Sequence, residues 1–165
     1  MSIHETLLEK HTPETWNGHI NEAGLGIIKT FEGWSSSVYV CPSGRYTIGW
    51  GSTWDHKGSP ITADQADITE KYGTTLLKRE IQHVERAIRR LIKAELTENM
   101  FSSLSSFAFN VGTGNLQRST LRMKLNRGKY EDAADELPKW RRGGGRILPG
   151  LVRRRAAERE LFLTV

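Results

Sequence analysis

The sequence predicts an α+β fold that is dominated by helices and carries one small β-hairpin. Apolar residues recur at three- and four-residue steps over much of the chain, most regularly between Leu77 and Ile92, as in amphipathic helices. Two short β-branched and aromatic runs, 38–40 and 46–48, flank a Pro-Ser-Gly-Arg turn. We therefore expect a small hairpin lobe and a larger helical lobe, joined by the long helix.

The first expected helix begins near Asn21 and ends at Gly33. Leu25, Ile28 and Phe31 recur at near-helical spacing, and glycine commonly ends a helix in the left-handed conformation. Glu32 would then lie in the last turn, where the helix dipole disfavours a negative charge and so favours the protonated acid. Residues 1–20 are expected to form a short helix or a loose arm, and residues 21–165 a single domain.

Helix signals continue through the rest of the chain. The stretch 62–65, Thr-Ala-Asp-Gln, resembles a capping box that opens a helix. Thr97 is expected to cap the helix that follows the long one, and Ser119 to cap a short helix that ends at Gly128. A further helix is predicted for Tyr130 to Leu137, ended by Pro138; then a flexible break at Gly143 to Gly145; and a last helix that starts at Pro149.

Composition limits the class of protein. The chain has 165 residues, 37% hydrophobic and 26% charged, as in a soluble globular protein with one well-buried core or two small lobes that share a helix. No apolar run approaches the ~20 residues that span a bilayer, and residues 1–22 lack the apolar centre of a signal peptide. Cys41 is the only cysteine, so neither an intramolecular disulfide nor a thiolate zinc site is expected.

The net charge of +5 predicts an anionic partner such as nucleic acid, a membrane surface or an acidic cell envelope. Much of the positive charge lies in the carboxy-terminal third. The histidines show no ligand spacing with acidic partners, so no metal site is expected; they are His4, His11, His19, His56 and His83.

The hairpin region brings together residue types that could perform acid–base chemistry. Glycoside hydrolysis needs a protonated acid for the leaving oxygen and a second group that activates water or stabilises the oxocarbenium ion. Glu32 could supply the acid, and Thr47 could hold a water through its hydroxyl. Each also has a plainer interpretation: Glu32 as a solvated helix end, Cys41 as a buried thiol, Thr47 as a strand former.

Taken together, the stretch FEGWSSSVYVCPSGRYTIGWGST resembles the catalytic signature of phage-type lysozymes, glycoside hydrolase family 24, which includes the T-even phage lysozyme. The order Glu32, eight residues, Cys41, five residues, Thr47 matches the family pattern. Further on, FSSLSSFAFNVGTGNLQRSTLRMKLNRGKYEDAADELPKWRR and GLVRRRAAERELF are similar to its later helices. The resemblance covers about Ala23 to Phe162.

The resemblance implies a lysozyme-like fold and a muramidase, which hydrolyses the β-1,4 bond between N-acetylmuramic acid and N-acetylglucosamine in peptidoglycan. It makes Glu32 the general acid, gives Cys41 the place usually held by aspartate, and lets Thr47 hold the water. It also implies that Phe109, Asn110 and Thr120 bind substrate in a saccharide cleft. For Phe109 and Asn110 the alternatives are core packing and a helix C-cap. The basic residues would attract the anionic wall.

The resemblance further implies an endolysin that needs no cofactor, binds glycan strands rather than a specific nucleic acid, and acts as a monomer. Such proteins accumulate in the host cytoplasm and reach the wall through a membrane lesion, normally made by a holin. Trp34, Trp50 and Trp54 are candidates to stack on sugar rings, with core packing as the alternative for at least one of them.

Cys41 is the departure from the usual carboxylate. An unperturbed thiol is mostly protonated at neutral pH, and an ionised Glu32 nearby would keep it so. Cys41 can act as base or nucleophile only if a positive group, such as Arg45, or hydrogen-bond donors lower its pKa.

Two other functions are compatible with the same residues. A lytic transglycosylase needs one glutamate and no activated water, and leaves anhydro-muramic ends instead of reducing ends. A non-enzymatic protein could bind membranes or nucleic acid through the basic segment from Lys139 to Arg159.

Overall fold

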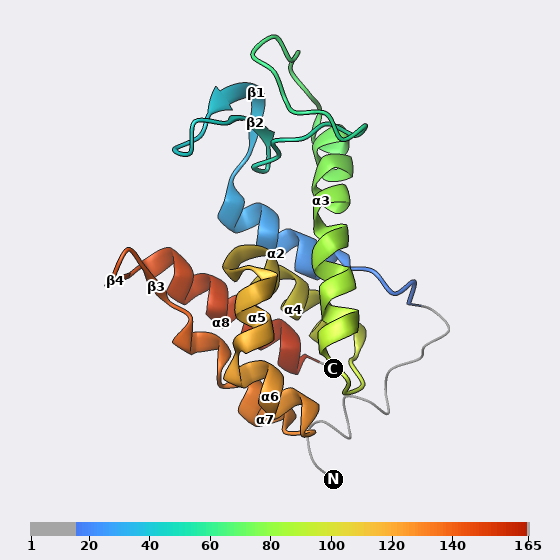
Figure 1. Cartoon of the computed structure of the whole chain (residues 1–165), viewed down its shortest axis with the longest axis vertical. Coiled ribbons are helices and arrows are strands. Elements are labelled where there is room, and N and C mark those ends of the chain that lie inside the picture. Colours follow the sequence, from blue (N-terminus) through green and yellow to red (C-terminus); the bar gives the residue numbers. More distant parts are fainter. Residues whose placement is uncertain (1–15, 165) are drawn as a thin grey trace. The chain divides into compact units, whose positions relative to one another are not determined.

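The computed structural model describes residues 16–164 and confirms the helix-rich α+β class (Figure 1). The helices are α2 (Glu22–Glu32), α3 (Glu70–Leu91), α4 (Glu98–Val111), α5 (Thr113–Arg118), α6 (Thr120–Asn126), α7 (Tyr130–Ala134), the 3-10 helix η1 (Leu137–Lys139) and α8 (Pro149–Leu163). The strands are β1 (Ser35–Val40), β2 (Tyr46–Gly49), β3 (Arg142–Gly143) and β4 (Arg146–Ile147). No helix in this range is both long and apolar enough to span a bilayer.

The chain divides into two compact units. The hairpin unit is Lys29–His83, and the helical unit comprises the described parts of Met1–Ile28 and Val84–Val165. Helix α3 runs without a break from one unit into the other, as the sequence predicted. The predicted arm lies mostly outside the described residues, and the part from 16 to 20 contains no helix.

The hairpin unit is built on the antiparallel pair β1–β2. Tyr39 pairs with Thr47, and Val40 with Tyr46, so the chain reverses through the predicted turn, where Gly44 has a φ of 83°. A small apolar core lies beneath β2; its buried members are Ile48, Ile61 and Leu76. The hairpin unit therefore has a core of its own.

A tryptophan pair fixes three elements of the hairpin unit. Trp34 follows α2, Trp50 follows β2, and their ring centroids lie 4.3 Å apart. Both rings press on Gly73 of α3, where a β-carbon would lie 2.4 Å from Trp34 and 3.2 Å from Trp50. Lys29 of α2 places its ammonium 4.4 Å from the Trp50 ring centroid. The ends of α2 and β2 are thus held against α3.

Helix α3 begins at Glu70, seven residues before the periodic segment from which the long helix was predicted, and no separate helix opens at 62–65. The expected capping box at 62–65 is wrong: the Thr62 hydroxyl bonds to Asp64, and this stretch forms a turn. The helix starts at Glu70, and the Thr69 hydroxyl accepts a hydrogen bond from the Tyr72 amide at 3.2 Å. Short polar residues favour turns as well as caps, so the pattern alone does not separate the two.

Helix α4 is the centre of the helical unit, and the predicted Thr97 cap accepts from the Met100 amide at 3.1 Å. The nine residues from Met100 to Ala108 are all buried. Four of them are serines, and each hydroxyl bonds within the helix or to a neighbouring segment: Ser102, Ser103, Ser105 and Ser106. Small side chains of this kind allow close packing against α8.

Helix α8 buries charges that its sequence seemed to leave exposed. Glu158 is fully buried and accepts from Ser106 at 2.7 Å, and Arg154 lies 3.2 Å from it. Arg155, also fully buried, places Nε 2.7 Å from Glu158 Oε2, as an ion pair whose geometry is not that of a hydrogen bond. Because these arginines neutralise an internal carboxylate, they are not part of a basic outer surface.

Two expectations near the carboxy terminus are corrected. The glycines after Arg142 form no open break; Gly144 and Gly145, with φ of 57° and 78°, make the tight turn of the β3–β4 hairpin. Pro138 lies inside the 3-10 helix η1 instead of ending a helix at Leu137. Helix α5 was not foreseen, because its six residues carry a single buried apolar side chain.

The tryptophan pair gives a test of the hairpin unit. We expect Gly73→Ala to destabilise the protein by about 1–3 kcal/mol in urea unfolding, because the new methyl group overlaps the Trp34 ring. Gly26→Ala is the matched control: it also lies in a helix, no atom lies within 4 Å of the built β-carbon, and it should gain up to about 1 kcal/mol from helix propensity. Equal stability changes in the two variants would contradict the packing argument.

Candidate active site

The three predicted catalytic residues all belong to the hairpin unit. Glu32 is the last residue of α2, as expected, and its side chain is exposed. The chain turns away at Gly33, which has a φ of 76° and donates its amide to the Lys29 carbonyl at 3.2 Å. The Glu32 carboxylate lies against Gly51, where a β-carbon would be 3.7 Å from Oε2. That distance is an ordinary contact, so it is the φ of 91° at Gly51 that favours glycine at this position.

Cys41 follows β1 and is held by the hairpin turn. Its amide donates to the Arg45 carbonyl at 2.9 Å, and its carbonyl accepts from the Gly44 amide at 2.8 Å. Its sulfur lies 2.9 Å from the Ser43 hydroxyl. The thiol is partly accessible and has a hydrogen-bonding environment, so it differs from a buried structural cysteine.

The turn lowers the pKa of Cys41 to about 6. The largest cause is the hydrogen bond from Ser43, followed by the Thr47 hydroxyl and the Arg45 backbone amide. Of the two agents that the sequence left open, hydrogen-bond donors lower the pKa, whereas the Arg45 guanidinium lies over the Trp54 ring, 5.6 Å from the centroid. About nine-tenths of the thiol would therefore be thiolate at pH 7.

Thr47 lies on β2 beside this sulfur and is almost wholly buried, with 2% of its surface exposed. Its hydroxyl donates to the Arg45 carbonyl at 3.0 Å. A hydroxyl has one proton, so the donation to Arg45 and the donation to the Cys41 thiolate exclude each other. Thr47 can thus exchange partners when the charge on the sulfur changes.

Tyr39 links Glu32 to Cys41 electrostatically. It pairs with Thr47 across the hairpin, and its pKa is raised by burial first and then by the charges of Cys41 and Glu32. Both charges therefore act on one phenol, and the acid and the thiol are within electrostatic range of Tyr39. The phenol stays protonated at neutral pH and can donate a hydrogen bond there.

The predicted substrate-binding residues lie in the helical unit. Phe109 is half-buried and packs against the main core, which was its alternative interpretation. Asn110 is exposed and lines a hollow of about 340 Å³, together with Trp140, Lys139 and Arg142 among others. Thr120 is exposed at the start of α6 and does not line that hollow. The structure thus groups Asn110 with residues that the sequence did not single out.

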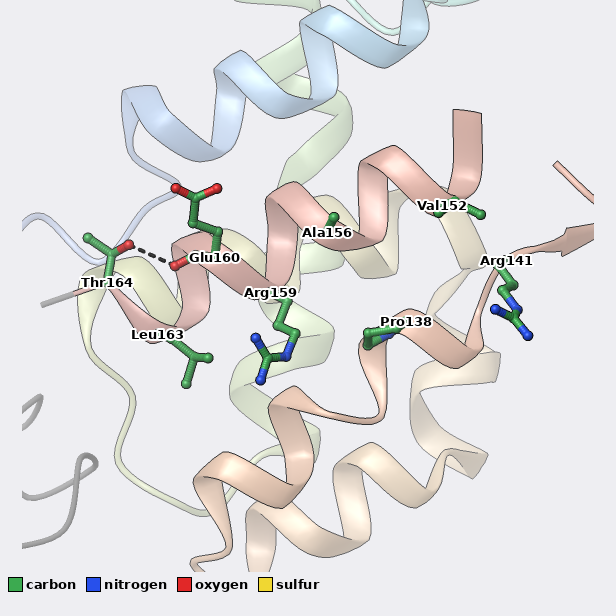
Figure 2. Close-up of a pocket in the computed structure, with 8 residues that line it drawn as sticks. All are labelled: Pro138, Arg141, Val152, Ala156, Arg159, Glu160, Leu163 and Thr164. Atoms are coloured by element: carbon green, nitrogen blue, oxygen red, sulfur yellow. Dashed lines mark hydrogen bonds between the residues drawn. The ribbon is translucent and has the colours of Figure 1, made fainter. Parts of the chain in front are cut away.

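A second hollow, of about 530 Å³, runs beside α8 and is shown in Figure 2. Arg159 and Leu163 on α8 face Pro138 of η1 across it, and no predicted site residue lines it. Arg159 is already engaged by Asp135, at 2.8 Å. This hollow is therefore separate from the candidate catalytic residues.

Two functional candidates were missed. Tyr39 stands inside the motif, two residues before Cys41, and the period-2 alternation of a strand places both on one face. Glu80 lies four residues from both Leu76 and Val84, so it interrupts the apolar stripe of α3. An acidic residue within an apolar helix stripe can be recognised from the sequence as a candidate functional residue. Among residues 16–164, no group of three or more potential ligands is arranged to hold a metal ion.

Solved structures share this fold. A mutant of P22 lysozyme, from Salmonella phage P22, is 33% identical to this chain and superposes with a TM-score of 0.82. The match covers 88% of this chain and 99% of the P22 lysozyme chain. The muramidase domain of SpmX from Asticaccaulis excentricus is 32% identical, with a TM-score of 0.77 over 89% of this chain and 99% of that domain. The fold is therefore lysozyme-like, as predicted.

The sequence comparisons agree. The endolysin of Bacillus phage B103 is 41% identical over 148 residues, which are 88% of this chain and 54% of that protein. The chain thus spans about half the length of this relative. The family model named phage lysozyme matches residues 29–158, and the chain belongs to that family. The resemblance drawn from the sequence motifs is confirmed.

The hydrogen bonds to Cys41 predict its reactivity. Alkylation by iodoacetamide should rise with pH around a midpoint near 6, because the thiolate is the reacting form. Ser43→Ala removes the main donor and should move the midpoint toward the ordinary thiol range. Ser36→Ala, on an exposed serine of the same hairpin, should leave it in place. A midpoint above 8 in the unsubstituted protein would refute the proposed stabilisation.

Proposed function

We propose that this chain is a muramidase of the endolysin type, which hydrolyses the β-1,4 bond between N-acetylmuramic acid and N-acetylglucosamine and so lyses bacterial cells. The observation that carries the proposal is the hairpin unit itself. It holds a carboxylic acid, Glu32, and a hydrogen-bonded thiol, Cys41, near one phenol, in a chain of the phage lysozyme family. The endolysin and muramidase names of the similar proteins support the same function.

In the proposed mechanism Glu32 protonates the leaving glycosidic oxygen while the sugar develops oxocarbenium character. The negatively charged Cys41 sulfur takes the place of the second carboxylate. It either accepts a proton from water or attacks the sugar carbon directly. Thr47, whose hydroxyl can leave the sulfur for the Arg45 carbonyl, is suited to hold the water in the first route.

The helical unit would contribute substrate contacts. Asn110 offers an amide, and Trp140, in the same hollow, offers an aromatic face suited to a pyranose ring. We also propose contacts from Phe109 and Thr120, by their positions in the family pattern. The net charge of +5 would favour approach to the anionic wall in a salt-dependent way.

We further propose that the protein is a monomer that accumulates in the host cytoplasm and depends on a holin or a similar membrane lesion to reach the wall. A lone cysteine kept as thiolate suits a reducing compartment. Expression without a holin should therefore leave cells intact until chloroform permeabilises them. Lysis without any permeabilising agent would contradict this dependence.

The catalytic assignment is tested by a turbidity assay on chloroform-permeabilised Gram-negative cells. Glu32→Gln keeps the shape but not the proton, so activity should fall by at least about 100-fold. Cys41→Ser should lose most activity, because a serine is not ionised at neutral pH, whereas Cys41→Asp restores an anion and should keep a measurable part.

The products and the controls decide between mechanisms. New reducing ends support hydrolysis, whereas anhydro-muramic ends would identify a lytic transglycosylase. A Cys41→Ser variant that lyses cells normally would make the cysteine structural. If the Glu32→Gln variant kills bacteria as fast as the unsubstituted protein does, the protein acts without enzymatic activity.

A further inference from the structure

Three aliphatic side chains lie exposed where the β3–β4 hairpin joins α8. Ile147 is 46% exposed, Leu148 is 40% exposed and Val152 is 42% exposed. A single exposed aliphatic residue is ordinary, but three between positions 147 and 152 concentrate apolar surface at one place in the helical unit.

The local structure holds these side chains together. Ile147 pairs with Arg142 across the hairpin. Leu148 packs on the hairpin, since a β-carbon built at Gly143 would lie 2.6 Å from its Cδ1. Its carbonyl accepts from the Val152 amide at 3.1 Å, so Val152 lies one helical turn further on. In Figure 1 the hairpin extends past the start of α8, away from the other helices of the helical unit, so both of its faces are accessible to a partner.

Exposed positive charges surround the aliphatic side chains. The sequence has no acidic residue between Glu136 and Glu158, and these two acids are buried and already paired with cations. The arginines of this stretch that remain exposed are Arg141, Arg142, Arg146 and Arg153. We call these four arginines and the three aliphatic residues the β3–β4 surface.

Neighbouring residues do little to neutralise this charge. The residues that line the hollow containing Arg142 include no acid. Arg141 and Val152 lie close together at one end of the hollow beside α8, and the acid that lines it, Glu160, lies toward the other end (Figure 2). The β3–β4 surface therefore presents hydrocarbon and positive charge side by side.

This combination selects the kind of partner. A polyanion such as nucleic acid offers phosphate to the arginines, but it has no hydrocarbon layer for the aliphatic side chains. An anionic bilayer offers both, because its phosphates lie directly above the acyl chains. Aliphatic side chains on a short projecting turn reach the boundary between the two without crossing the membrane.

We propose that the β3–β4 surface docks the protein on an anionic phospholipid bilayer. The aliphatic side chains enter the acyl boundary, and the arginines pair with lipid phosphates. Docking is a binding activity separate from the proposed muramidase reaction and does not depend on it.

The apolar part is tested by cosedimentation of the full chain with vesicles. The protein should bind vesicles of equal parts phosphatidylglycerol and phosphatidylcholine, and bind pure phosphatidylcholine much less. Ile147→Ser should weaken binding to the mixed vesicles about fivefold, because serine gains little from the acyl boundary. Met123→Ser is the matched control: it lies on α6, outside the β3–β4 surface, is 44% exposed, and should bind as the unsubstituted protein does.

The charged part is tested with two double variants that each remove two positive charges. Arg146→Gln with Arg153→Gln should weaken binding to the mixed vesicles by at least about tenfold, since each arginine near an anionic surface contributes about fivefold. Arg86→Gln with Arg90→Gln, on exposed arginines of α3, should have little effect. Equal losses in the two double variants would show that net charge alone attracts the protein, and would overturn the proposal.

Polyphosphate serves as an anion without hydrocarbon. Ile147→Ser should leave polyphosphate binding unchanged while it weakens vesicle binding. Equal losses on the two would show that position 147 supports the fold instead of meeting hydrocarbon. Binding to polyphosphate without binding to mixed vesicles would assign the surface to a polyanion. Either result would overturn membrane docking.

The site of contact is tested by a second pair of variants that keep the apolar character. In Ile147→Trp the added indole fluorescence should be quenched by lipids with brominated acyl chains, whereas in Met123→Trp it should not. Equal quenching in the two variants would place the contact elsewhere and refute the assignment. None of these measurements uses peptidoglycan, so failure of the muramidase proposal would leave their outcome unaffected.

Discussion

The packing of Trp34 and Trp50 on Gly73 is the constraint from which the site follows. Trp34 is two residues from Glu32, and Trp50 is three residues from Thr47, so one apolar contact sets where the acid and the strand lie relative to α3. Because a β-carbon at 73 would overlap the Trp34 ring, this packing favours glycine at the end of the first turn of α3, despite the cost in helix propensity. The positions of the proposed catalytic groups thus depend on the packing of two tryptophans against a glycine of α3.

Within the hairpin unit, local hydrogen bonds determine the charge of the proposed catalytic thiol. Hydroxyl and amide donors of the turn after β1 and of β2 lower the pKa of Cys41, so this thiol can carry a negative charge at neutral pH. Glu80, on α3 of the same unit, has its pKa raised to about 7, by burial first and also by the charge of Glu32. One hairpin unit therefore moves two pKa values in opposite directions toward neutrality, a pattern associated with functional sites.

In the helical unit, helix α4 is buried on all sides between Met100 and Ala108. Its buried serines all form hydrogen bonds through their hydroxyls. Two of these serines, Ser103 and Ser106, donate to Glu158 of α8. Removing Glu158 would leave the buried Arg154 and Arg155 without their shared partner, which is more costly than the ion pairs are stabilising. The arginines that made α8 look like a basic surface helix are in part internal structure.

The sequence by itself determined the helix-rich α+β class, the hairpin, the Thr97 and Ser119 caps and the family, because these depend on local periodicity, turn chemistry and motif order. It also pointed to the candidate acid, thiol and threonine. It did not determine which donors stabilise Cys41, or that Glu80 lies behind the Gly51–Thr53 segment, since these contacts join residues that are distant along the chain or depend on the exact path of a turn. Burial of Arg155 likewise depends on the packing of α8 against α4. Charge and desolvation are properties of the folded surroundings, so only the tertiary structure decided them.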